Sequence, residues 1–142
     1  MNKTLVICSG YFNPVHKGHI EYLKKSSELG DYLYVIVNND LQVSLKGSKP
    51  FMEEQERKII VESLYFVDSA MVSIDKDRSV VESVKKIVKD SENAFTRYIF
   101  ANGGDQNNGT IAESEICKAL GVELIDGLGD KIQSSSKLKS KL

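Results

Sequence analysis

His16 and His19 are the two histidines of this 142-residue chain, and both lie in the stretch GYFNPVHKGH (10–19). If a helix begins near Lys17, the two imidazoles lie about one turn apart at its N-terminus. Backbone N–H groups at a helix N-terminus and imidazole donors both suit phosphate oxygens. Gly18 leaves room where a ligand would approach the first turn. The spacing therefore predicts a phosphate site.

Two other interpretations of the histidine pair are open. Zinc needs three or four protein ligands, and only Cys8 and Asn13 are near in sequence, so a metal site is disfavoured. A plain helix start, with one capping and one buried histidine, is the usual explanation for a lone histidine. Two histidines around a glycine, directly after an apolar segment, favour the phosphate site instead.

Further stretches hold groups that suit a polyphosphate. Lys46 lies beside Gly47 and can act as a mobile point charge, although a solvated surface lysine is the common case. Ser134, Ser135 and Ser136 can cap a helix and bind an anion through hydroxyl and N–H groups together. A simple cap before a frayed terminus is the alternative for these serines.

Two charged residues are candidates for other contacts. Asp105 in NGGDQ could bind ribose, an acceptor or a metal-bound water, and an Asx turn is equally compatible. Arg78 in DKDRS could meet an acceptor phosphate, or it could begin the next helix as a solvated residue.

The elements that must position these residues follow from hydrophobic patterning. Continuous apolar runs, typical of strands covered on both faces, occupy 4–9, 32–37, 70–74, 98–101 and 122–125. Helical patterns occupy 18–29, 53–66, 79–90 and 111–120. This alternation predicts one doubly wound α/β domain over residues 1–142, with a five-stranded parallel sheet.

Loops that follow parallel strands meet at one edge of the sheet, where ligands bind. The predicted strand-end loops contain the candidate residues above except His19, which directly follows the first of them: 10–18, 38–51, 75–79, 102–110 and 126–136. This convergence is an independent indication of a site.

Composition limits the possible functions. Lys and Arg (19) nearly balance Asp and Glu (20), leaving a net charge of −1, which argues against a nucleic-acid binder. Cys8 and Cys117 lie in separate apolar segments, which predicts buried free thiols and a cytoplasmic location. The start of the chain has only four consecutive apolar residues, and no apolar run reaches membrane-spanning length.

GYFNPVHKGH resembles the GxFxxxHxGH signature of the cytidylyltransferase-like nucleotidyltransferases, and the resemblance covers residues 4–136. This superfamily includes glycerol-3-phosphate and choline-phosphate cytidylyltransferases, heptose-1-phosphate adenylyltransferase and archaeal FAD synthetase. The resemblance implies a Rossmann-like fold with His16, His19 and Lys46 as catalytic residues. It also implies nucleotide contacts by Gly10, Tyr11, Phe12, Asn13, Gly18, Asp105, Lys131, Ser134, Ser135 and Ser136. A dinucleotide-binding fold is disfavoured because GxGxxG does not follow the first strand.

Several positions bear on the substrates. Arg57 matches a family arginine that could contact the acceptor, although a helix ion pair with Glu53 or Glu54 is nearly as compatible. Asn13 replaces an aspartate found in many members. Gly129 stands where cytidylyltransferases often carry arginine, which Lys131 can replace. Tyr65 also replaces a basic residue. The departures at Gly129 and Tyr65 favour the ATP-using branches over the CTP-using ones.

The implied reaction is in-line attack of an acceptor phosphate on the α-phosphorus of an NTP, with Mg²⁺ arriving with the nucleotide. A small phosphorylated metabolite is the expected acceptor, a sugar or polyol phosphate first and FMN second. A homodimer is expected from the small family members. A nucleotide-binding module without catalysis is the competing hypothesis.

Overall fold

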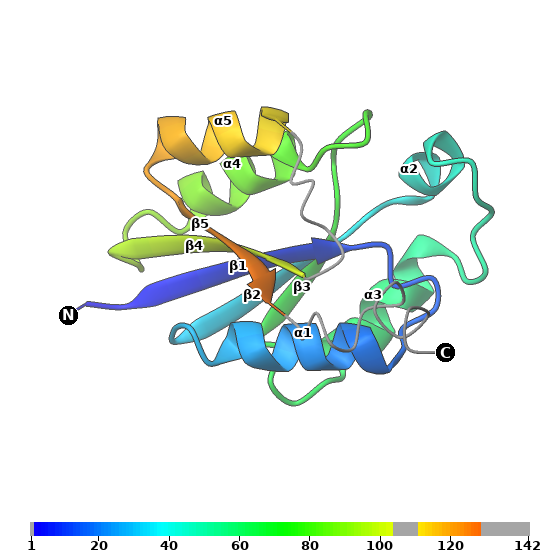
Figure 1. Ribbon diagram of the computed structural model, residues 1–142, viewed down its shortest axis with the longest axis horizontal. Coiled ribbons are helices and arrows are strands. Elements are labelled where there is room, and N and C mark those ends of the chain that lie inside the picture. The colour runs from blue at the N-terminus through cyan, green and yellow to red at the C-terminus, as the bar shows by residue number, and fades with distance from the viewer. Residues whose placement is uncertain (1, 104–110, 129–142) are drawn as a thin grey trace.

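The computed structural model describes residues 2–103 and 111–128 (Figure 1). The strands are β1 (Thr4–Gly10), β2 (Tyr32–Val37), β3 (Ser69–Val72), β4 (Arg97–Gly103) and β5 (Glu123–Leu128). The helices are α1 (Lys17–Ser27), α2 (Asp40–Leu45), α3 (Glu54–Glu62), α4 (Val81–Asp90) and α5 (Ile111–Leu120). No helix within these two ranges is long and apolar enough to cross a membrane.

The described strands form one sheet in the order β3-β2-β1-β4-β5, and every pairing is parallel. The chain first moves outward from β1 to β3 and then crosses over to β4. The strand order therefore reverses beside β1, and ligands of such folds bind at the carboxyl end of that reversal. The predicted α/β fold with a five-stranded parallel sheet is confirmed.

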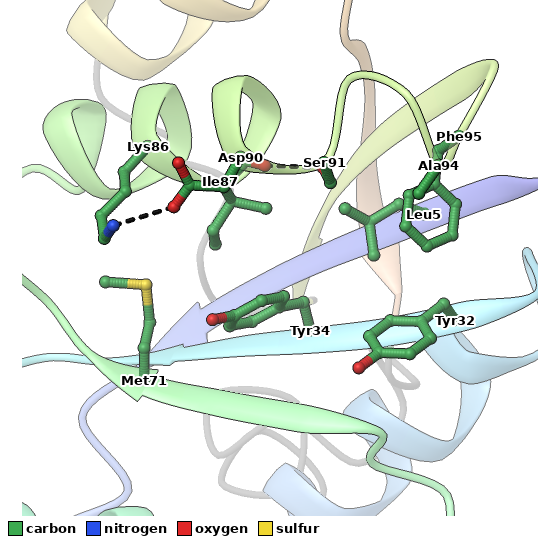
Figure 2. Close-up of a pocket in the computed structure, with 10 residues that line it drawn as sticks. All are labelled: Leu5, Tyr32, Tyr34, Met71, Lys86, Ile87, Asp90, Ser91, Ala94 and Phe95. Carbon is green, nitrogen blue, oxygen red and sulfur yellow. Dashed lines mark hydrogen bonds and ion pairs between the residues drawn. The ribbon is translucent and has the colours of Figure 1, made fainter.

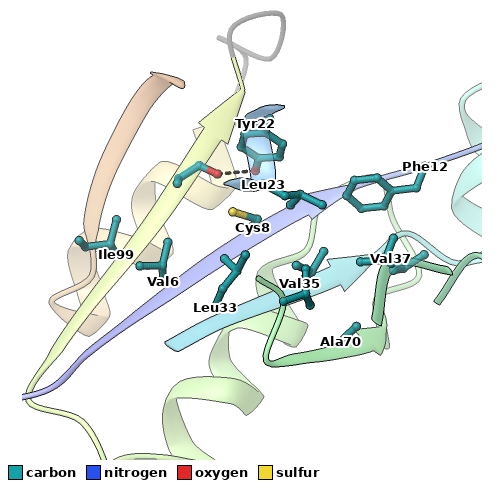
Figure 3. Close-up of a cluster of buried hydrophobic side chains, with 13 residues drawn as sticks. Val6, Cys8, Phe12, Tyr22, Leu23, Leu33, Val35, Val37, Ala70 and Ile99 are labelled. Atoms are coloured by element: carbon teal, nitrogen blue, oxygen red, sulfur yellow. Dashed lines mark hydrogen bonds between the residues drawn. The ribbon is translucent and has the colours of Figure 1, made fainter. Parts of the chain in front are cut away.

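Helices cover both faces of the sheet, with α1 and α3 on one side and α4 and α5 on the other (Figure 1). Alternate residues of β1 divide between the two cores because successive side chains of a strand point to opposite faces. Val6 and Cys8 pack on the α1 side (Figure 3). Leu5 and Ile7 pack on the α4 side. Burial on both faces explains the continuous apolar runs of the sequence.

Helix α2 lies inside the segment predicted as the loop 38–51, so that prediction is wrong in part. Asn39 caps the helix by accepting a hydrogen bond from Gln42 N (2.8 Å), and the Gln42 side chain accepts from Asn39 N (3.0 Å). This reciprocal pair is a capping box, for which N-x-x-Q is a sequence signature. The motif NDLQ could therefore have identified the helix.

Strand β3 ends at Val72 and α4 begins at Val81, inside the predicted bounds of 70–74 and 79–90. Asp75 explains the later helix start. Its carboxylate accepts hydrogen bonds from Glu82 N (2.7 Å) and Ser83 N (3.0 Å). These two N–H groups therefore have a partner without carbonyl groups from a preceding turn of helix.

Candidate functional site

His16 and His19 cap the start of α1 reciprocally. His16 is the N-cap residue, and its Nδ1 accepts a hydrogen bond from Gly18 N (3.1 Å). His19 Nδ1 in turn accepts from His16 N (3.1 Å). A backbone N–H can only donate, so each Nδ1 must be unprotonated. The proton of each neutral imidazole is therefore on Nε2, which makes both Nε2–H groups available as donors.

The two imidazole rings are stacked, with centroids 3.8 Å apart and planes 25° apart. The ring of Phe12 meets His19 edge-on at 5.0 Å. His16 is exposed and His19 is half-buried. The stack thus presents two parallel rings, and with them two N–H donors, at the carboxyl end of β1.

Burial, together with smaller contributions from repulsion by His16 and by Lys46, lowers the pKa of His19 to about 4. His19 is accordingly neutral at pH 7. A neutral imidazole with the proton on Nε2 can donate to a phosphate oxygen and still accept the backbone hydrogen bond on Nδ1.

The site should respond to acid in a defined direction. Because the pKa of His19 falls from 6.5 in the unfolded chain to about 4 in the native state, the unfolded state binds the extra proton first. The stability that this group contributes is complete above pH 6.5 and is lost as the pH falls toward 4. We expect the urea midpoint to fall in that window, and less so for His19→Asn. An NMR titration placing His19 near 6.5 would contradict this expectation.

A cavity of about 230 Å³ opens beside the histidines. Its lining residues come from the first strand-end loop and from the segment around α2: Tyr11, Phe12, Asn13, Pro14, His16, His19, Val43, Lys46 and Ser48. Lys46 Nζ lies 4.3 Å from the centroid of the Tyr11 ring, a cation–π contact. The structure therefore brings the three residues predicted as catalytic to one cavity.

Gly10 and Gly18 make room for side chains of the same loop. A Cβ on Gly10 would lie 2.8 Å from the Phe12 ring, and one on Gly18 would lie 3.1 Å from His16 Cε1. Phe12 is fully buried and has a φ of 51°, a conformation that residues other than glycine rarely adopt. These residues shape the loop around the histidines.

Asn13 joins the first loop to the segment before α3. Its Nδ2 donates to Lys49 O (2.9 Å), and its Oδ1 accepts from Phe51 N (2.6 Å). An aspartate could not donate to the Lys49 carbonyl. The asparagine is thus accounted for by a contact within the chain.

Arg57 requires a correction. Its side chain is fully buried, and its ion pair is with Asp40 (2.6 Å), so the predicted pairing with Glu53 or Glu54 is wrong. A fully buried guanidinium also cannot contact an acceptor substrate that binds from solvent. The predicted contact between Arg57 and the acceptor substrate is therefore wrong as well.

The remaining candidates lie elsewhere. Arg78 is exposed on the segment between β3 and α4 and does not line the histidine cavity. Asp105, Lys131 and the serines 134–136 lie outside the described residues.

A second cavity of about 360 Å³ lies between α4 and strands β2 and β3 (Figure 2). Figure 2 shows the ring of Tyr34 beneath α4, the ring of Tyr32 beneath Phe95 after the helix, and the Lys86–Asp90 ion pair on α4. Leu5 and Tyr32 belong to the first residues of their strands, so this cavity lies toward the amino ends of the sheet. Among the described residues, none of those predicted for phosphate chemistry lines it.

Comparison with known proteins agrees with the geometry. A family model described as cytidylyltransferase-like matches residues 7–127. FAD synthase of Picrophilus torridus is 29% identical over 141 residues, covering 96% of this chain and 94% of the relative. Bifunctional protein HldE of Syntrophotalea carbinolica is 35% identical over 128 residues, covering 87% of this chain but only 24% of HldE.

Solved structures include a similar protein. The lipopolysaccharide core biosynthesis protein from Thermoplasma volcanium superposes with a TM-score of 0.69 at 26% identity, over 91% of this chain and 99% of that one. The family match spans most of the sequence, including the histidine pair and Lys46. The chain therefore belongs to the cytidylyltransferase-like family of nucleotidyltransferases.

Proposed function

We propose that this chain transfers a nucleoside monophosphate from an NTP to a small phosphorylated acceptor and releases pyrophosphate. The observation that carries the proposal is the pair of Nε2–H donors of His16 and His19, held beside Lys46 in one cavity. Family membership gives independent support.

In this reaction an oxygen of the acceptor phosphate forms a bond to the α-phosphorus. The bond from the α-phosphorus to the bridging oxygen breaks, and pyrophosphate leaves with the electron pair. A phosphate nucleophile is already ionised near neutral pH, so positioning and charge stabilisation matter more than a general base. His16 and His19 would donate to the oxygens that gain negative charge in the transition state.

The triphosphate charge needs further neutralisation. Lys46 offers a flexible ammonium at the rim of the cavity. Within residues 2–103 and 111–128 no group of three or more His, Cys, Asp or Glu side chains could hold a metal ion. Mg²⁺ is proposed to enter with the NTP, held by phosphate oxygens, which is its usual mode with nucleotides. Ser134, Ser135, Ser136, Lys131 and Asp105 remain proposed nucleotide contacts.

Relatives support a choice of substrates. FAD is an adenine dinucleotide, so the likeness to FAD synthase favours transfer of AMP over CMP. The likeness to HldE and to a lipopolysaccharide core biosynthesis protein favours a sugar or polyol phosphate as acceptor. FMN is the second candidate, because FAD synthase is matched over nearly its whole length. The homodimer and the cytoplasmic location stay predictions.

The test is a pyrophosphate-release assay over ATP, CTP, GTP and UTP, each with Mg²⁺, against heptose 1-phosphate, glycerol 3-phosphate and FMN. We expect turnover with ATP and one of these acceptors. A thermal-shift screen of the same nucleotides supplies a binding readout, because a ligand of the native state raises the midpoint by mass action. Tight nucleotide binding without turnover on any acceptor would replace the proposal with a binding module.

A further inference from the structure

Arg57 of α3 is a buried cation whose donors are directed at four acceptors on three segments of the chain. Its Nη1 donates to Tyr11 O (2.7 Å) and Asn38 O (2.7 Å), which follow β1 and β2. Its Nε donates to Met52 O (2.9 Å), and its Nη2 donates to Asp40 Oδ1 (2.6 Å). A buried charge is costly unless it is paired and hydrogen-bonded. Arg57 meets both conditions, so its position is tightly determined.

Asp40 links the Arg57 side chain to the start of helix α2. It is the first residue of α2, and Glu54 is the first residue of α3. Asp40 N donates to Glu54 Oε1 (2.8 Å), and Glu54 N donates to Asp40 Oδ2 (3.3 Å). The two helix starts therefore cap each other, and Arg57 closes the arrangement through the other carboxylate oxygen of Asp40. The start of α2 is fixed against α3.

Lys46 stands at the other end of α2. It is the C-cap residue, and its N–H donates to Gln42 O (3.0 Å). The six residues of α2 form a rigid spacer of about 9 Å between Asp40 and Lys46. Across the cavity, the Lys46 ammonium lies on the ring of Tyr11, whose carbonyl is held by the same guanidinium.

We propose that Arg57 is a positioning residue for Lys46. Through Asp40 it sets the helix that carries Lys46, and through the Tyr11 carbonyl it sets the ring on which the ammonium rests. It thus fixes both partners of the contact that places a positive charge beside the histidine pair. The consequence for catalysis rests on the proposed function, in which Lys46 neutralises the triphosphate.

Asp40→Asn is the sharpest perturbation, because Arg57→Met could simply fail to fold. The variant removes the charge partner but leaves the three carbonyl hydrogen bonds of Arg57 in place. We expect KM for the NTP–Mg²⁺ complex to rise roughly 5- to 20-fold, with kcat changed less. The reason is that asparagine has no negative charge for Arg57, and its single side-chain oxygen replaces the two that accept from Arg57 and from Glu54 N. Glu62→Gln breaks the exposed ion pair with Lys58 on the same helix and should change neither constant.

A double-mutant cycle with Lys46→Met shows whether Asp40→Asn changes KM through Lys46 or through a general loss of structure in the site. If Asp40 acts through Lys46, adding Asp40→Asn to Lys46→Met raises KM by less than about twofold, because coupled residues are not additive. If Asp40→Asn raised KM by the same factor in the wild type and in Lys46→Met, the proposal would be overturned.

A measurement on the free protein tests the positioning role of Arg57 independently of the proposed function. The Tyr11 ring should shift the NMR signals of the Lys46 ε-protons upfield in the free protein. We expect Asp40→Asn and Arg57→Lys to reduce this shift and Glu62→Gln to leave it unchanged. An unchanged shift in Asp40→Asn would refute the positioning role even if turnover is normal. Absence of turnover in the wild type would refute only the proposed function.

Discussion

Replacing His19 with alanine is expected to lower kcat by about 100-fold or more, with a smaller effect on nucleotide binding. The loss follows because one preorganised donor to the transition state is removed, and single donors of this kind contribute about 10²–10³ in kcat. Burial holds the pKa of His19 at about 4, so at pH 7 the donor is a neutral Nε2–H group. The measurement is steady-state pyrophosphate release at saturating NTP.

Alanine at this position also removes the acceptor for His16 N, so a matched variant must isolate the donor. His19→Asn places Oδ1 near the position of Nδ1 and should keep the capping hydrogen bond, while it loses the Nε2–H donor. We expect His19→Asn to be nearly as inactive as His19→Ala but closer to the wild type in thermal midpoint. Wild-type turnover in either variant would show that the proposed mechanism is wrong.

Replacing Phe12 with alanine is expected to destabilise the protein by about 3–5 kcal/mol, the usual cost of emptying a buried phenylalanine site. Figure 3 shows the ring beyond the end of β1, at one edge of the buried cluster. Alanine also keeps a Cβ at a φ of 51°, so the variant gains no relief in the backbone. Chemical denaturation with a linear extrapolation measures the loss.

Phe12→Ala should also lower activity, because the ring packs edge-on against His19. Phe51→Ala is the matched control, since that ring is 75% exposed and its removal should change stability by no more than about 0.5 kcal/mol. Equal effects of the two substitutions would mean that burial of Phe12 does not support the site.

The sequence predicted most of the fold because burial on both faces leaves a simple pattern. Short continuous apolar runs such as TLVIC and YLYVIV are typical of strands that are buried on both faces of a parallel sheet. The histidine spacing correctly indicated a helix start near Lys17, where His16 is the N-cap residue and His19 is half-buried. The phosphate site that we predicted from the same spacing stays a prediction. Helix α2 was missed because it has only six residues and its apolar residues alternate with polar ones, which is not a helical period.

The role of Arg57 could not be predicted from sequence, and the reason is physical. It stands in the charged run EEQERK, where a surface helix position is the natural expectation. Burial of this one cation depends on carbonyl groups that follow β1 and β2, and on a carboxylate at the start of α2. Only the folded chain brings those acceptors together. The left-handed conformation of Phe12 likewise depends on the space left by Gly10.

The reciprocal caps at the start of α1 also limit metal coordination by the two histidines. An imidazole that coordinates a metal through Nε2 must carry its proton on Nδ1. In both His16 and His19, however, Nδ1 already accepts a hydrogen bond from a backbone N–H. Coordination through Nε2 would place two hydrogens against each other and break that capping hydrogen bond. The contacts that leave each Nε2–H as a donor therefore disfavour the same nitrogen as a metal ligand.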